Sequence, residues 1–166
     1  MDPAVSSKVD QVIATFRLEE ACSVTDVLAA VARHRGRDLT LQPLPARADF
    51  GHLFGLCLPY PDRDVILFRT GAGVSHELHS TLHECGHLLL DHIPAVARSS
   101  ATDSTIALLL PDLDAGLIRE ALARSSYEDR QEQEAETFAM TMRRVLETQQ
   151  LRRCDVVLSR FDNALD

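Results

Sequence analysis

Five of the seven histidines of the 166-residue chain lie between positions 76 and 92, and among them the sequence His-Glu-Cys-Gly-His occupies positions 83–87. On a helix, residues four positions apart are rotated by only about 40° from each other, so the imidazoles of His83 and His87 can share one cation. Glu84 lies alongside, where its carboxylate can reach a water molecule bound to that cation. The spacing therefore predicts a zinc (Zn2+) site at which Glu84 acts as a general base in hydrolysis.

The residues next to this motif predict that its helix is mostly buried. Leucines occupy positions 82 and 88–90. Two histidines and a glutamate in such surroundings must be paired or bound to a metal, because each polar group has to recover the hydrogen bonds that it loses on leaving water. The alternative, a solvated polar face, fits these apolar neighbours poorly. Cys85, on the opposite side of the helix, is interpreted as a small core residue.

A catalytic zinc site needs a third protein ligand and one position left for water. We expect that ligand in a helix predicted over residues 126–149. This helix is predicted to begin there because Ser125 and Glu128 have the spacing of a capping box. On a helical wheel Glu128 and Glu132 fall within or at the edge of the apolar stripe, whereas Glu134 points away. Glu132 is the better ligand, since dipole and capping alone explain a carboxylate in the first turn, where Glu128 lies. The stripe consists of Ala135, Phe138, Ala139, Met142 and Leu146.

Other polar side chains near the motif are candidates for supporting roles. Glu136, one turn after Glu132, is placed to hydrogen bond the second nitrogen of a ligating histidine and fix its tautomer. The alternative for both acids is an ordinary solvated helix surface. His76 and His79 are candidates for polarising a carbonyl or binding a second metal, with helix capping and solvent exposure as the alternative. Asp91 is placed to orient an imidazole or to serve at the surface, and Tyr127 is a candidate oxyanion donor without independent support.

The N-terminal third of the chain has the apolar spacing of two helices. The first passes through residues 9–16, and the second covers residues 24–35 and ends at Gly36. Arginines at positions 33, 35 and 37 cluster at the end of the second helix. Because cations are favoured at a helix C-terminus in any case, we interpret this cluster as dipole stabilisation rather than as a DNA-reading surface.

The middle of the chain changes to the pattern of short strands. Three runs rich in Leu, Val, Ile and Phe cover residues 39–45, 53–58 and 64–69. Prolines and aspartates between the second and third runs favour a hairpin turn. Prolines 43 and 45 place the first strand at an edge of the sheet, since proline cannot donate to a strand ladder.

Helical spacing returns after the strands. A helix capped by Ser75 is predicted over residues 75–91, followed by a loop at 95–111, a short helix at 112–124, the helix at 126–149 and a last amphipathic piece at 151–161. No repeat or linker interrupts the chain. We therefore expect one α+β domain over residues 1–166, with helices packed on a small, mainly antiparallel, three-stranded sheet.

Charge and composition narrow the class of partner. The 17 basic and 25 acidic residues give a formal net charge of −8, which argues against direct binding to nucleic acid or to an anionic membrane and favours a protein partner. The four cysteines form no CxxC pair and the first residues form no apolar leader, so we expect a cytoplasmic protein with reduced thiols. Lys8 is the only lysine, an arginine bias typical of a GC-rich bacterial genome.

Two segments together resemble a known family. The sequence HECGHLLL from position 83 and the sequence EQEAETFA at 132–139 are similar to the ImmA/IrrE metallopeptidases, whose pattern is HExGH followed by Glu-x-x-Ala/Cys-Asn/Asp-x-Phe-Ala. The resemblance covers residues 20–146, including the two preceding helices and the small sheet. It implies a zincin-like fold with the HExxH motif on a core helix. Residues 140–144 depart from the family, in which a leucine-rich segment often follows Phe-Ala.

The resemblance also implies roles for particular residues. His83, His87 and Glu132 would be zinc ligands, and Glu84 would be the general base. Glu136 stands where the family usually has Asn or Asp. This side chain is one methylene longer than Asp, which alters the reach of its carboxylate towards a ligating histidine.

These observations favour two classes of function. The first is a zinc-dependent endopeptidase, and the family resemblance implies a cytoplasmic regulatory protein as substrate, often a helix-turn-helix repressor in stress response or mobile-element control. The alternative is a non-proteolytic zincin-fold module that keeps the metal and regulates a transcription factor by binding it. The intact Glu84 favours the enzyme, because metal retention needs only the ligands. A metal-dependent hydrolase of small molecules is a third class, for which no residue identifies a substrate.

Overall fold

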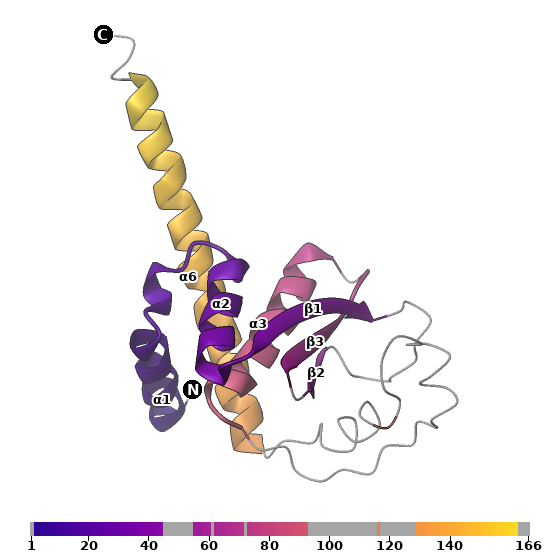
Figure 1. The fold of residues 1–166 in the computed structure, drawn as a ribbon. Coiled ribbons are helices and arrows are strands. Elements are labelled where there is room, and N and C mark those ends of the chain that lie inside the picture. The colour runs from indigo at the N-terminus through magenta and orange to yellow at the C-terminus, as the bar shows by residue number, and fades with distance from the viewer. Residues whose placement is uncertain are drawn as a thin grey trace.

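The computed structural model describes residues 2–44, 55–60, 62–71, 73–92, 116 and 129–162. In these ranges four α-helices and a short 3-10 helix accompany a small three-stranded sheet, which is an α+β structure (Figure 1). No helix in the same ranges combines the length and apolar character that crossing a bilayer requires. The elements in chain order are α1 (Pro3–Thr15), η1 (Leu18–Glu20), α2 (Val24–Arg35), β1 (Asp38–Leu44), β2 (Gly55–Pro59), β3 (Arg63–Arg69), α3 (Val74–Leu89) and α6 (Asp129–Asp162).

The two N-terminal helices begin at polar side chains that satisfy their first backbone N–H groups. Asp2 accepts a hydrogen bond from the Ala4 N–H at 2.9 Å and so caps α1. Ser23 and Asp26 form a capping box at the start of α2. Gly36 ends α2 in the left-handed conformation, with φ of 65°. The range of α2 and its end at glycine confirm the sequence prediction.

The sheet has β3 in its centre, with β2 antiparallel on one side and β1 parallel on the other. The predicted hairpin is confirmed, because Gly55 pairs with Phe68 and Pro59 pairs with Asp64. The edge position predicted for the first strand is confirmed as well. The sheet is mixed rather than mainly antiparallel. The sequence could not predict this, because hydrophobic alternation indicates which side chains face the core but not in which direction a strand runs.

A buried carboxylate ties the end of α2 to this sheet. Asp64 on β3 has a fully buried side chain that accepts a hydrogen bond from Arg35 Nε at 2.9 Å and lies 3.5 Å from Arg37 Nη1. Two of the three arginines in the cluster therefore pair with the carboxylate, in addition to their favourable position at the helix C-terminus. Such a buried charge requires partners of this kind.

The helix that carries the His-Glu-x-x-His motif, α3, forms close to where it was predicted. Its N-cap residue is Gly73 and not Ser75, whose hydroxyl oxygen instead accepts a hydrogen bond from Arg143 Nη2 at 2.9 Å. The first turn is tied down by Glu77, which accepts from the Gly71 N–H at 3.0 Å. Glutamate in a first turn is favoured by the helix dipole.

The last helix, α6, is longer than predicted. It continues to Asp162, so the separate piece expected at 151–161 is its final part, and Figure 1 shows this part extending beyond the other elements. No glycine or proline follows position 149 to end the helix. The predicted start at 126–128, the short helix at 112–124 and the loop at 95–111 lie outside the described residues, apart from Gly116 in a helical conformation.

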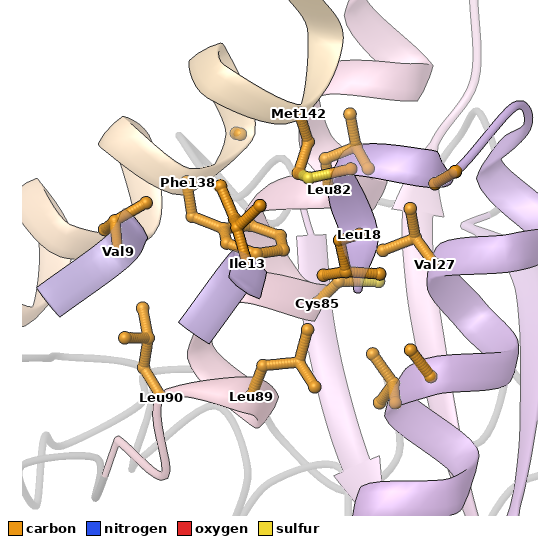
Figure 2. Close-up of a cluster of buried hydrophobic side chains, with 14 of the residues drawn as sticks. Val9, Ile13, Leu18, Val27, Leu82, Cys85, Leu89, Leu90, Phe138 and Met142 are labelled. Atoms are coloured by element: carbon orange, nitrogen blue, oxygen red, sulfur yellow. The ribbon is translucent and has the colours of Figure 1, made fainter. Parts of the chain in front are cut away.

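The core lies where α3 packs between the sheet and α6 (Figure 2). Leu82 and Cys85 of α3 and Phe138 and Met142 of α6 are fully buried there. Gly86 permits the close approach of the two helices, because a Cβ atom at this position would lie 3.0 Å from Phe138 Cδ1. The apolar stripe predicted on α6 and the core position of Cys85 are thus confirmed.

Candidate metal site

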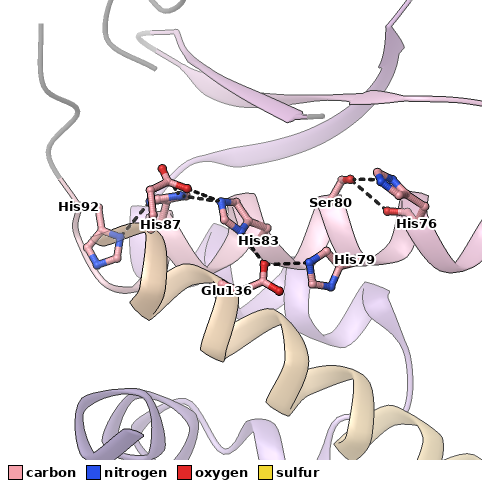
Figure 3. A network of polar contacts seen from close by, with 8 residues as sticks. His76, His79, Ser80, His83, His87, His92 and Glu136 are labelled. Carbon is pink, nitrogen blue, oxygen red and sulfur yellow. Dashed lines mark hydrogen bonds and ion pairs between the residues drawn. The ribbon is translucent and has the colours of Figure 1, made fainter. Parts of the chain in front are cut away.

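The three predicted ligands come together where α3 and α6 pack. His83, His87 and Glu132 each offer a ligand atom, and these atoms all lie within 4.8 Å of one another. The Nε2 atoms of the two histidines are 3.0 Å apart, and Figure 3 marks this contact with a dashed line. The two carboxylate oxygens of Glu132 lie 3.4 Å from His83 Nε2 and 3.6 Å from His87 Nε2. One turn of α3 and one side chain of α6 therefore bring nitrogen and oxygen donors together.

These separations fit a tetrahedral divalent cation. With bonds of about 2.0–2.1 Å to each donor, ligand atoms of tetrahedral zinc lie roughly 3.3 Å from one another. The Nε2–Nε2 separation of 3.0 Å is close to that value, and each Nε2 atom has a different oxygen of Glu132 within 3.6 Å. Two imidazoles and one carboxylate are also the donor types that such a catalytic site uses, with a fourth position left open. The residues present therefore fit a bound metal ion.

Exposure increases steadily across the three ligands. The side chain of His87 is 2% exposed, that of His83 is 21% exposed, and that of Glu132 is 45% exposed. A ligand set of this kind is anchored in the protein interior at one end and is open at the other. The open end is the part of the set that solvent reaches.

The surroundings of the two histidines move their pKa values in opposite directions. Burial, and then the neighbouring His83 and His92, lower the pKa of His87 to about 2, so this imidazole is neutral and ready to act as a ligand. Burial also lowers the pKa of His83, but the hydrogen bond to Glu132 and the charges of Glu84 and Glu136 outweigh it, so the pKa is raised. Without a metal, His83 is the imidazole that holds the extra proton more readily.

Glu84 is buried beside strand β2. Burial raises the pKa of its carboxyl group to about 7, opposed by the charge of His83. Gly55 of β2 makes room for this side chain, since a Cβ atom on Gly55 would lie 2.7 Å from Glu84 Oε1. This contact was not predicted from the sequence, although a glycine inside a strand pattern is a signal of close approach by another group.

Glu134, placed by the helical wheel away from the apolar stripe, is not among the three converging groups, but its side chain is only 3% exposed, which the wheel did not predict. Its carboxylate pairs with Lys8 of α1 and accepts hydrogen bonds from Arg130 Nε at 3.1 Å and from His92 Nε2 at 3.0 Å. The helical wheel failed here because α6 contacts α1 as well as α3, which widens the buried face beyond one apolar stripe. His92, which was not singled out, is itself within hydrogen-bonding distance of His87.

Glu136 lies near the site without binding a ligating histidine closely. Its Oε2 atom is 3.6 Å from His83 Nδ1, beyond a normal hydrogen bond, and 3.0 Å from His79 Nε2 (Figure 3). His76 contacts Ser80, and Asp91 contacts His34 at 3.0 Å instead of His87. The two other candidates from sequence analysis, Glu128 and Tyr127, lie outside the described residues.

Comparison of the chain with models of protein families, with curated proteins and with solved structures finds no match.

Proposed function

We propose that the protein is a zinc-dependent endopeptidase. The proposal rests mainly on one observation, the convergence of His83, His87 and Glu132 beside a buried glutamate, Glu84. The ligands account for metal binding and leave a coordination position free. Glu84 has no role in holding a metal, and this buried acid therefore needs another explanation, which hydrolysis supplies.

Zinc held by His83, His87 and Glu132 would supply Lewis acidity to the hydrolytic water and to the scissile carbonyl. Glu84 takes the proton from the attacking water and later delivers it to the leaving amine nitrogen. A pKa of about 7 suits both steps, because the carboxyl group can accept and release a proton near neutral pH. Cleavage of the C–N bond then gives a carboxylate and an amine.

The substrate class follows from the family resemblance and from charge. The paired segments at 83–90 and 132–139 resemble ImmA/IrrE metallopeptidases, so we propose a cytoplasmic regulatory protein, specifically a helix-turn-helix repressor, as substrate. The formal net charge of −8 supports a basic partner of this kind. Binding of the same repressor without cleavage would define the alternative, a regulatory metal-binding module.

The experiment compares the parent protein with Glu84→Gln. Both are loaded with zinc and incubated with repressors encoded near the gene, with and without a chelator, and products are identified by mass spectrometry. We expect Glu84→Gln to bind one zinc per chain and to lose at least 100-fold in cleavage rate, since general base catalysis contributes about 100- to 10,000-fold.

A matched control is Glu147→Gln, an equivalent change on the exposed side of α6, which should cleave at the parent rate. Cleavage by Glu84→Gln at the parent rate would disprove the assigned mechanism. A stable complex of the zinc-loaded parent with a repressor, without products, would support the binding module instead.

A further inference from the structure

Behind His87 lies a chain of polar contacts that the mechanism above does not use. His87 Nδ1 is 2.9 Å from His92 Nδ1, and His92 Nε2 is 3.0 Å from Glu134 Oε2. The side chains of His92 and Glu134 are 2% and 3% exposed. Figure 3 shows the ring of His92 next to that of His87, on the side away from His83. Three buried polar groups therefore lead from the metal site into the protein.

The acidic end of this chain fixes the direction of one hydrogen bond. Glu134 is paired with Lys8 and with Arg130, so its carboxylate acts as an acceptor. His92 must then donate from Nε2. A neutral imidazole that carries its proton on Nε2 has an acceptor lone pair on Nδ1, and this lone pair faces His87.

The metal position independently fixes the direction of the hydrogen bond between His87 and His92. The atom of His87 that faces the other ligands is Nε2. An imidazole that binds a metal through Nε2 keeps its proton on Nδ1, so His87 must donate from Nδ1 to His92. The proton positions required by Glu134 and by a metal ligand are therefore identical. Only one arrangement of protons along the chain satisfies both ends.

We propose that His92 and Glu134 are positioning residues that hold His87 in the Nδ1–H tautomer, with the Nε2 lone pair directed at the metal position before any metal binds. The proposal rests on the metal site described above but not on proteolysis. It assigns a role to two residues that do not touch the metal position themselves. It also connects that site to α1, because Lys8 pairs with Glu134.

The first test needs no substitution. In the metal-free parent, labelled with 15N, NMR of the imidazole nitrogens reports which nitrogen of His87 carries the proton. We expect a protonated Nδ1 and an unprotonated Nε2. A protonated Nε2 with a bare Nδ1 in the metal-free parent would overturn the proposal.

The second test compares His92→Leu, which removes both the donor and the acceptor, with His92→Gln, which can supply both from an amide. Zinc affinity is measured by competition with a chromophoric chelator. We expect His92→Leu to lower the affinity about 10- to 100-fold, as is usual when the outer partner of a ligating histidine is lost. His92→Gln should recover part of this loss. The NMR spectrum of His92→Leu should show His87 shifted towards the Nε2–H tautomer.

Glu134→Gln provides a second route if His92→Leu does not fold, and it should lower zinc affinity in the same direction. Glu136→Gln is the matched control from the same helix, since Glu136 lies 3.6 Å from the other ligating histidine, and it should change the affinity less than about threefold. Parent-like affinity and an unchanged His87 tautomer in His92→Leu would contradict the proposal. If these results hold while no repressor is cleaved, the positioning role stands and the proposed proteolysis fails.

Discussion

The two histidines of the candidate metal site, His83 and His87, lie one turn apart on α3 but in very different surroundings. On one side His87 contacts His92, which contacts Glu134, and we call these three residues the buried arm; Glu134 pairs in turn with Lys8, whose side chain is 44% exposed. On the other side His83 has Glu136 at 3.6 Å, and Glu136 contacts His79 at 3.0 Å. We call these three residues the open arm, because the side chains of Glu136 and His79 are 49% and 24% exposed.

The difference follows from where α6 packs. This helix contacts α3 along one face and α1 along another, so the residues between the three helices are shielded from water. Glu134 falls in that shielded region, whereas Glu136, two positions later, faces outward. Polar contacts that are buried in this way are held in one geometry, while exposed ones exchange readily with water. In the proposed metal site, the buried arm would thus fix one ligand, and the open arm would leave the other adjustable.

Substitution of each histidine in turn tests the difference between the two arms most strongly. His87→Ala and His83→Ala should both lower zinc affinity about a thousand-fold, because zinc sites bind with roughly 10–16 kcal/mol in total and each protein ligand carries several of these. Only His87→Ala should also lower the free energy of unfolding of the metal-free protein by about 1–3 kcal/mol, since His92 loses a buried hydrogen bond. The corresponding loss for His83→Ala should stay below about 1 kcal/mol.

Chelator competition measures the affinities, and urea unfolding in the presence of a chelator measures the stabilities. An equal loss of stability in the two variants would mean that the arms do not differ in the way described. A parent-like zinc affinity in either variant would remove that histidine from the ligand set.

The pH dependence of stability tests whether Glu84 is shielded from water in the folded, metal-free protein. The pKa of Glu84 is raised by burial from 4.5 to about 7, so the folded state favours the protonated carboxyl. This contribution is fully present below about pH 4.5 and is lost as the pH rises through about 7, up to roughly 3 kcal/mol. The metal-free parent should therefore lose stability relative to Glu84→Gln between about pH 5 and pH 8. Urea unfolding at both pH values measures the difference in free energy of unfolding between the two proteins. This difference would be the same at both pH values if water reached the carboxylate freely.

Much of the site could be predicted from the sequence because it depends on local spacing. The i and i+4 positions of His83 and His87 fix their common direction on any helix, and the structure brings Glu132 to them. Gly36 ends α2 because a glycine can adopt the left-handed conformation that this helix end requires. In each case the physical cause lies within a few residues of its effect.

The remaining features depend on contacts between distant segments. Burial of Glu134 requires α1 beside α6, and these are 126 residues apart in the contact between Lys8 and Glu134. The space for Glu84 requires Gly55, on a strand that packs against α3. The parallel pairing of β1 with β3 likewise depends on the path of the chain and not on the side chains of either strand. A helical wheel or an alternation pattern carries no information about such neighbours.

The smallest effect is expected at the outer end of the open arm. His79→Leu removes the 3.0 Å contact with Glu136, but an exposed ion pair contributes only about 0–1 kcal/mol. Zinc affinity should change less than about threefold, and the free energy of unfolding by less than about 0.5 kcal/mol. The same two measurements on His92→Leu, which makes the equivalent change in the buried arm, provide the reference. If His79→Leu weakened zinc binding as much as His92→Leu, then Glu136 would position His83 as firmly as His92 positions His87, and the distinction between a fixed and an adjustable ligand would fail.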